Sequence, residues 1–546
     1  MNKNTTILSA HKHRLLYIPI AVLFMLSFVD CAKRGRPTGG PKDSIPPIIV
    51  RSVPENFTTN FTGDEIRIYF DEYIKLKDLS KNLLISPPLE VAPLITPLSS
   101  SKMLKVKFND TLRANTTYSI NFGNSIEDNN ENNTLTNYKY VFSTGSFIDS
   151  LKVTGRITDA LSGEVKKPVS IMLYEKNVAY TDSLIFTQKP SYVTMVQDST
   201  NTFELTNIKE GNYLLIALQE ENRNYTYQPK TDKIGFIESD VTLPTDKTYD
   251  IAVFKEIPIY SLARPKQESQ NRITFGYEGA IDSLDIQLLT SAPRDYKNRI
   301  IKEYKKDSLQ YWYAPSFEQD SLVFRVQKNS VTDTVTVRIK ELYKDSLRIS
   351  QRNTTVLRLK DSVVLEISTP LMSLDKEKMM VTDKDTLAIA FEARLHKREN
   401  TAVLYFDKKE EQTYTLNILP KAFTDFFGNT NDSLRFNYRT KLLSDYGTIN
   451  VTLQNLNDQD AIVQIVSDTY EVVQEVRLSK EAAPKAYFES LNPANYYIRI
   501  IIDTNTNGIW DTGDFLNRTD PEKVIYYPVQ IELKSNWSLE ETFILE

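Results

Sequence analysis

Residues 65–70 read EIRIYF, a strand-length segment in which every second residue is apolar and points to one face. This period of two predicts a β-strand with one buried face. The same pattern recurs between clusters of Asn, Asp, Gly and Pro at 103–108, 117–122, 272–277, 321–326, 332–339, 413–418 and 448–453. Short strands separated by turn residues predict an all-β protein made of sandwiches or barrels.

The length and charge of the chain set broad limits. A chain of 546 residues is long enough for about three to five domains of roughly 100–200 residues each. The formal net charge is −5, and Lys and Arg are spread along the sequence. Nucleic-acid binding needs a concentrated basic face, so we expect no nucleic-acid partner.

Cysteine and histidine are too scarce for several kinds of catalytic site. The chain has one cysteine, Cys31, and three histidines, His11, His13 and His396. The first two histidines lie in a segment that we expect to be removed. This scarcity excludes a Cys–His nucleophile, a Cys-rich zinc site and a metal site built from several histidines. A Ser–His–Asp triad would have to use His396. Residues 394–400 read RLHKREN, which predicts a solvated turn, so we expect no enzyme and no required cofactor.

The amino terminus has the features of an export signal. Positive residues precede the continuous apolar run 15–29, LLYIPIAVLFMLSFV, which is too short to span a membrane but suits the h-region of a signal peptide. The run ends beside Cys31. An isolated cysteine at this point resembles a bacterial lipoprotein signal, although Asp30 stands where Gly, Ala or Ser is usual. The resemblance implies a signal peptide at 1–30, a lipid on Cys31 and a membrane anchor.

The segment 31–45 after that cysteine is rich in Pro and Gly and has no apolar period, so it predicts a flexible tether. The next segment, 46–148, resembles the bacterial Ig-like domain of S-layer and other surface proteins. The residues that carry this resemblance are PP at 46–47, SVPEN at 52–56, IRIYFDEYI at 66–74, YSI at 118–120, IEDNN at 126–130 and YVFSTG at 140–145. Leader, tether and this domain together resemble a Bacteroidota lipoprotein family.

Internal similarity divides the remainder of the chain. A second Ig-like copy is predicted at 353–442, because 414–429 parallels 118–130. Residues 212–224 align without gaps with 495–507 and place Tyr227 on Trp510. Their surroundings resemble the prealbumin-like or carboxypeptidase-regulatory β-sandwich, a non-catalytic module. The predicted modules are the first at 46–148, the second at 149–255, a third, divergent Ig-like one at 256–352, the fourth at 353–442 and the fifth at 443–546. Such repetition is typical of a modular array.

One segment has the spacing of a calcium loop. Residues 503–514 read DTNTNGIWDTGD, with side-chain oxygens at positions 1, 3, 5, 9 and 12 and Gly508 at position 6, as in an EF-hand loop. The predicted ligands are Asp503, Asn505, Asn507, the carbonyl of Ile509, Asp511 and Asp514. Position 12 is the shorter Asp rather than Glu, and no helices flank the loop. The alternative is a metal-free turn rich in Asn, Asp and Gly. The earlier copy keeps Glu220, Asn222 and Asn224 but has Tyr225 in place of glycine.

A distributed pattern resembles the O-glycosylation sequon of exported Bacteroidota proteins, with Ser or Thr as the acceptor. Asp is followed by Ser or Thr and then by an apolar residue or Thr at Asp43, Asp110, Asp149, Asp182, Asp198, Asp282, Asp307, Asp320, Asp333, Asp345, Asp361, Asp385 and Asp432. The alternative is ordinary turn chemistry at the start of a strand.

Together these features predict a non-catalytic outer-membrane lipoprotein that presents β-sandwich modules to a protein or glycan partner. The face of the membrane stays open, although residues 32–34, AKR, lack acidic residues and favour the periplasm. One alternative is an accessory subunit of an outer-membrane assembly or secretion machine. Another is a lipoprotein that binds glycans, or degrades them with paired carboxylates.

Overall fold

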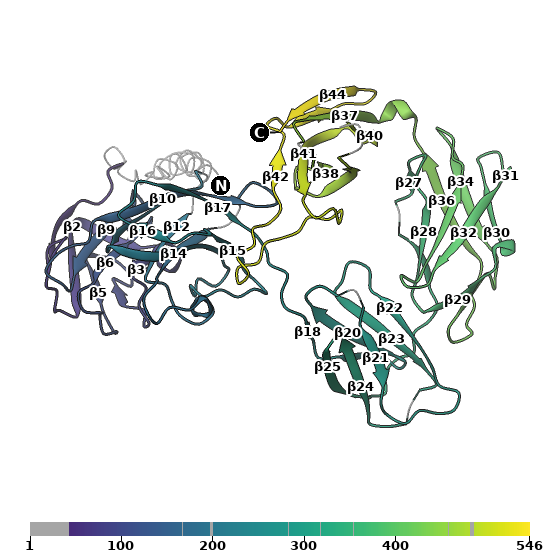
Figure 1. Cartoon of the computed structure of the whole chain (residues 1–546), viewed down its shortest axis with the longest axis horizontal. Coiled ribbons are helices and arrows are strands. Elements are labelled where there is room, and N and C mark those ends of the chain that lie inside the picture. Colours follow the sequence, from purple (N-terminus) through teal and green to yellow (C-terminus); the bar gives the residue numbers. More distant parts are fainter. Residues whose placement is uncertain are drawn as a thin grey trace, which may run out of the picture. The chain divides into compact units, whose positions relative to one another are not determined.

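The structure is a computed structural model that describes residues 43–165, 168–196, 200–281, 283–316, 318–352, 354–456, 458–480 and 485–545. Strands make up most of its regular structure (Figure 1), which confirms the all-β prediction. The described residues form two compact units, one with those from 43 to 83 together with 91–111 and 120–140, the other with 84–90, 112–119 and those from 141 to 545. Among the described residues, no helix has the length and apolar character needed to cross a membrane.

The first module contains nine strands and one helical turn. They are β1 (Ile49–Val53), β2 (Glu65–Leu76), α2 (Leu79–Asn82), β3 (Leu84–Ser86), β4 (Leu94–Thr96), β5 (Ser101–Lys107), β6 (Thr117–Asn121), β7 (Ile126–Asp128), β8 (Thr134–Leu135) and β9 (Lys139–Ser143). One sheet has the order β4-β5-β2-β7-β8 with β1 also on β2, and the other has the order β3-β6-β9. Ile66, Ile68 and Phe70 of β2 are buried while their neighbours are more exposed, which confirms the period of two.

The fourth module repeats the central part of both strand orders. Its elements are β26 (Ile349–Gln351), β27 (Val356–Leu357), β28 (Val363–Ile367), β29 (Leu371–Leu374), η2 (Lys376–Lys378), β30 (Met379–Thr382), β31 (Ala388–Ile389), β32 (Phe391–His396), β33 (Thr401–Phe406), β34 (Thr413–Ile418), β35 (Phe423–Asp425) and β36 (Leu434–Thr440). Its sheets are β26-β28-β33-β32, β27-β36-β34-β30-β31 and β29-β35. The order β26-β28-β33-β32 corresponds to β1-β2-β5-β4 of the first module, and β36-β34-β30 corresponds to β9-β6-β3. Strand β26 lies before the predicted boundary at residue 352. It nevertheless pairs with β28 from Ile349 to Gln351, so it belongs to the fourth module.

A shared contact supports the equivalence of these two modules. The backbone N–H of Arg113 donates to the hydroxyl oxygen of Tyr118 over 2.8 Å. The N–H of Lys409 donates to the hydroxyl of Tyr414 over 2.7 Å, five residues apart in both cases. The two tyrosines are the residues that begin the aligned segments 118–130 and 414–429, so the structure agrees with that alignment.

The second and fifth modules form another matched pair. The second contains β10 (Leu151–Asp159), β11 (Val169–Glu175), η1 (Asp182–Phe186), β12 (Tyr192–Val196), β13 (Thr202–Ile208), β14 (Gly211–Gln219), β15 (Lys233–Phe236), β16 (Val241–Leu243) and β17 (Thr248–Val253). The fifth contains η3 (Leu443–Asp445), β37 (Gly447–Gln454), β38 (Asp460–Val466), β39 (Val472–Leu478), β40 (Lys485–Leu491), β41 (Ala494–Asp503), β42 (Val524–Tyr526), β43 (Ile531–Leu533) and β44 (Ser538–Ile544).

Their sheets correspond strand by strand. The second module has β13-β10-β17 and β12-β11-β14-β15 with β16 on β14, and the fifth has β40-β37-β44 and β39-β38-β41-β42 with β43 on β41. Strands β10 and β17 run parallel, as do β37 and β44. Each module has its own apolar core, which includes Val153 and Leu215 in one and Ile449 and Ile498 in the other.

The third module is a β-sandwich with its own core. Its strands are β18 (Ser261–Leu262), β19 (Lys266–Ser269), β20 (Arg272–Glu278), β21 (Asp285–Leu288), β22 (Lys297–Lys302), β23 (Ser308–Ala314), β24 (Ser321–Lys328) and β25 (Val331–Arg338). They form the sheets β18-β20-β23-β22, with β19 on β20, and β21-β24-β25. Phe275 packs edge to face on both Tyr311 and Phe324, so residues of both sheets meet in one core.

Candidate functional site

The predicted calcium loop begins at Asp503, the last residue of β41. Its buried carboxylate accepts hydrogen bonds from the backbone N–H groups of Asn507 at 3.1 Å and Gly508 at 2.8 Å. Gly508 has a φ of 76°, a left-handed conformation that glycine adopts at little cost. The carboxylate at position 1 therefore holds the sharp turn that the sequence predicts at position 6.

Two asparagine side chains connect this turn to Asp511. The amide groups of Asn505 and Asn507 donate to Oδ2 of Asp511 over 2.6 and 2.7 Å. The N–H of Ile509 donates to Oδ1 of Asn507 over 2.8 Å. The structure therefore brings together five of the six predicted ligand residues. Hydrogen bonds within the loop engage side-chain oxygens of Asp503, Asn505, Asn507 and Asp511.

Asp514 is in a turn of its own. Its carboxylate accepts from the N–H of Asn517 at 2.8 Å and from the side-chain amide of the same residue at 2.9 Å. Within the described ranges, no three or more His, Cys, Asp or Glu side chains are grouped so that they could hold a metal ion. The three predicted aspartates thus do not gather at one point, so Asp514 does not fit the predicted ligand set. Calcium binding by the remaining residues stays a prediction.

Glu522 closes the loop, and sequence reasoning missed it. Its buried carboxylate accepts from the N–H of Thr504 at 2.7 Å, from the Thr504 hydroxyl at 2.8 Å and from the N–H of Asp511 at 3.1 Å. The indole N–H of Trp510 donates to the Glu522 carbonyl at 3.1 Å. Glu522 lies beyond the twelve-residue window by which calcium loops are recognised, so spacing gave no signal for it.

The earlier copy of the loop uses the same first contact. Glu220 stands at the position of Asp503, and its carboxylate accepts from the N–H of Tyr225 at 3.1 Å. Tyr225 keeps the left-handed backbone with a φ of 58°, although it is not a glycine. Burial raises the pKa of Glu220, so this carboxylate is already partly desolvated by the protein.

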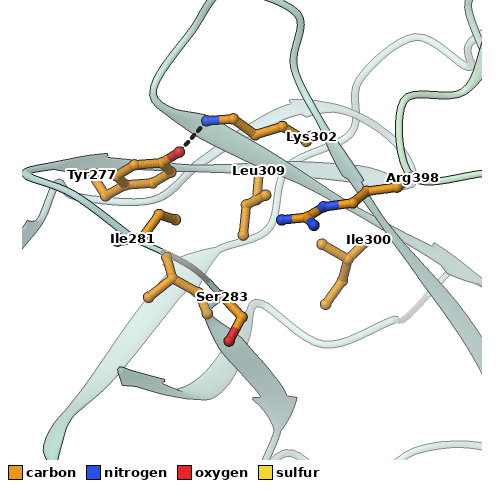
Figure 2. A pocket seen from close by; sticks show the side chains of 8 residues that line it. Tyr277, Ile281, Ser283, Ile300, Lys302, Leu309 and Arg398 are labelled. Atoms are coloured by element: carbon orange, nitrogen blue, oxygen red, sulfur yellow. Dashed lines mark hydrogen bonds between the residues drawn. The ribbon is translucent and has the colours of Figure 1, made fainter. Parts of the chain in front are cut away.

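A separate pocket lies at β20 and β22 (Figure 2). Its volume is about 280 Å³, and its lining consists of Tyr277, Ile281, Ser283, Leu284, Ile300, Lys302, Leu309 and Arg398. The ammonium group of Lys302 donates to the Tyr277 hydroxyl and, over 2.7 Å, to the carbonyl of Lys306. Apolar walls beside two cationic side chains suit a small ligand that combines an apolar body with an acidic group.

The sequence predicted a turn at His396, but the structure does not place this residue in one. It is the exposed last residue of β32 and pairs with Thr401, so the turn is confined to the residues between β32 and β33. The segment extends as a strand because Ala393 and Leu395 alternate with polar residues and pack against the core of the fourth module. Cys31 and the predicted signal peptide lie outside the described residues.

The acceptors of the predicted sequons differ in exposure. Ser308 is buried, and its hydroxyl donates to Glu303. The acceptors that are exposed are Ser44, Thr111, Ser150, Ser183, Ser283, Thr334, Ser346, Thr386 and Ser433. Asp198 and Asp282 lie outside the described residues. Exposure makes modification geometrically feasible at those nine positions, and glycosylation itself stays a prediction.

Comparison with known proteins gives one family and several distant structures. No curated protein sequence matches the chain. Surface layer protein SbsC, domains 1–6, is 12% identical over 90% of this chain and 68% of its own, with a TM-score of 0.16. The Bacillus anthracis TIE protein is 10% identical over 93% and 75%, with a TM-score of 0.15. Residues 43–144 match the bacterial Ig-like domain family, as the sequence of the first module predicted.

Proposed function

We propose that this chain is a non-catalytic, lipid-anchored structural and interaction protein of the outer membrane. The observation that carries the proposal is the duplication of two kinds of sandwich. The second and fifth modules share one strand order, and the first and fourth modules share the central part of another. Rigid sheets that present variable loops are a common framework for binding. Fold alone does not specify an activity, so the partner must be sought at the loops and exposed surfaces.

Exposed apolar side chains of the first module support a macromolecular partner. Ile48 and Val50, at the beginning of the described chain, are 56% and 62% exposed, and Leu98 in the turn after β4 is 92% exposed. Apolar groups on the surface favour contact with another protein, because burial removes them from water. A glycan partner is the second candidate, and the pocket beside Tyr277 and Lys302 is where an acidic sugar would fit.

The proposal is tested by cross-linking the tagged full-length chain in intact cells of its source and identifying what co-purifies in mild detergent. We expect an envelope protein in the cross-linked product, and protease shaving of the same cells reports the membrane face. Recovery of a β-barrel complex would favour the accessory-subunit alternative. Binding on a glycan array without a protein partner, or glycan hydrolysis by the purified chain, would contradict the proposal and favour the glycan-directed alternative.

A further inference from the structure

The loop after β41 continues into a segment that packs against the second module. Residues 512–518, which we call the docking arm, follow Asp511 and carry Phe515, which is fully buried. Phe515 belongs to an apolar cluster whose other buried members are all from the second module, including Tyr227, Phe236 and Phe254. A side chain of the fifth module therefore completes a core of the second, although the two segments are more than 250 residues apart in sequence.

Aromatic and ionic contacts surround Phe515. Its ring lies edge to face on Phe236, with 5.7 Å between the ring centroids. The guanidinium of Arg518 lies 4.3 Å from the centroid of Phe515 and 5.6 Å from that of Phe236. Arg518 also forms an ion pair with Asp182 over 2.6 Å. One cation therefore covers the aromatic pair and neutralises a carboxylate of the second module.

The backbone of the arm is fixed as well. The N–H of Phe515 donates to the carboxylate of Glu256, which also accepts from the hydroxyl of Tyr227 over 2.5 Å. The hydroxyl of Thr512 donates to the carbonyl of Lys255 over 2.7 Å. A Cβ atom on Gly513 would lie 2.6 Å from the ring of Phe254, so only glycine permits this approach.

A second patch involves the end of β42. The hydroxyl of Tyr526 donates to the carbonyl of Leu161 over 2.7 Å. The buried guanidinium of Arg499 lies 3.4 Å from the same carbonyl oxygen and 3.3 Å from the Tyr526 hydroxyl. The fifth module thus contacts the second through the arm and through strand residues of its own sheet.

We propose that the second and fifth modules form a stable intramolecular pair, in which the aromatic face of Tyr227, Phe236 and Phe254 is the receptor for the docking arm. The second module recognises a phenylalanine of the docking arm, which becomes buried, and the arginine that follows it three residues later. The chain between the modules, with the whole third and fourth modules, is then closed into a loop whose ends are held by this contact. This inference does not depend on the proposed function, because it concerns contacts within the chain.

The test separates the fifth module from the remainder of the chain without changing the interface. A site-specific protease sequence is inserted between Lys441 and Leu442 in the full-length protein, which is cleaved after folding and analysed by gel filtration. We expect the fifth module to co-elute with the remainder of the wild-type chain. Phe515→Ala should release it, whereas Leu516→Ala, at a neighbouring side chain that is 53% exposed, should not.

A charge exchange between Asp182 and Arg518 distinguishes loss of the contact from misfolding of a module. Asp182→Arg alters only the second module and opposes Arg518 with a like charge, so we expect release or at least a tenfold weaker association. Asp182→Arg combined with Arg518→Glu restores opposite charges and should restore co-elution. The proposal is overturned if the wild-type fifth module separates on cleavage, or if both Phe515→Ala and Asp182→Arg leave it bound as in the wild type.

Discussion

Tyr496 donates its hydroxyl hydrogen to the main-chain carbonyl of Asn492, four residues earlier, over 2.6 Å. Tyr213 makes the same contact with the carbonyl of Lys209 over 2.8 Å. Both tyrosine side chains are buried, at 4% and 1% exposure. A tyrosine that fixes the turn before its own strand in this way resembles the tyrosine corner of Ig-type sandwiches.

We expect Tyr496→Phe to lower the free energy of unfolding of the fifth module by about 1–3 kcal/mol, because it leaves a carbonyl in the turn without its donor. Tyr213→Phe should have a similar effect on the second module. Thermal unfolding of the full-length variants measures both. A control is Tyr487→Phe, since the Tyr487 ring is 58% exposed and should be replaceable at little cost. Equal effects of the Tyr487 and Tyr496 substitutions would contradict the role of the corner.

The sequence predicted these repeats because their evidence is local. Period-two segments, the turn residues between them and the ungapped match of 212–224 with 495–507 all lie within short windows. Each of the eight quoted period-two segments falls on a strand, from β2 at Glu65–Leu76 to β37 at Gly447–Gln454. The alternation of apolar and polar residues specifies which face of a strand is buried. It can therefore be recognised in the sequence whatever the order of the strands in the sheet.

The contacts of Asp514, Glu522 and Phe515 could not be predicted in the same way. The EF-hand spacing assigns position 12 to the loop, but hydrogen bonds to Asn517 hold Asp514 in the following turn. Glu522 reaches the loop because β42 returns beside β41. The burial of Phe515 depends on a contact across more than 250 residues, for which a single sequence without an alignment carries no local signal.

Tyr438 is expected to cause alkaline destabilisation of the fourth module. Burial raises the pKa of this tyrosine from 10.0 to about 12, and its buried hydroxyl has no hydrogen-bond partner among the described residues. The unfolded chain therefore loses this proton at lower pH than the folded chain does. The free energy of unfolding should be unaffected by this group below pH 10 and should fall as the pH rises from 10 to about 12.

Tyr438→Phe should accordingly be neutral or stabilising by up to about 1 kcal/mol at pH 7, because it removes an unsatisfied polar atom. It should also flatten the fall in stability between pH 10 and 12. Urea unfolding at several pH values measures both effects. Tyr414→Phe is the matched control, since Tyr414 pairs with Tyr438 across the strands but accepts a hydrogen bond from Lys409. Strong destabilisation by Tyr438→Phe at pH 7 would show that its hydroxyl has a partner.

Cys31→Ala should release the protein from membranes. A diacylated cysteine with a further amide-linked chain supplies enough buried CH₂ groups for stable anchoring, whereas a single acyl chain binds only reversibly. Fractionation of cells that express either form measures the effect, and radiolabelled palmitate should enter the wild-type protein only. Membrane association of the wild type without incorporation of palmitate would contradict lipidation.

Calcium at the 503–514 loop is the remaining prediction. Asp503, Asn505, Asn507 and Asp511 already lie together, and rotation of each asparagine amide by half a turn would present its oxygen in place of its nitrogen. Ca²⁺ prefers six to eight oxygen ligands, so the carbonyl of Ile509 and water would have to contribute. Asp514 is held by Asn517 in the next turn and should contribute little.

We expect the full-length protein to melt at higher temperature in 10 mM calcium than in chelator, because a ligand that binds only the folded state stabilises it by mass action. Sites of the extracellular type have dissociation constants of about 10⁻⁴–10⁻³ M, so 10 mM should saturate the loop. Trp510 lies inside the loop, and its emission, identified by comparison with Trp510→Phe, should change on titration with calcium.

Asp503→Ala with Asp511→Ala should abolish both the rise in melting temperature and the change in emission, whereas Asp514→Ala should preserve them. If calcium changes neither the melting temperature nor the emission of the wild type, the loop is a turn closed by its own hydrogen bonds and by Glu522.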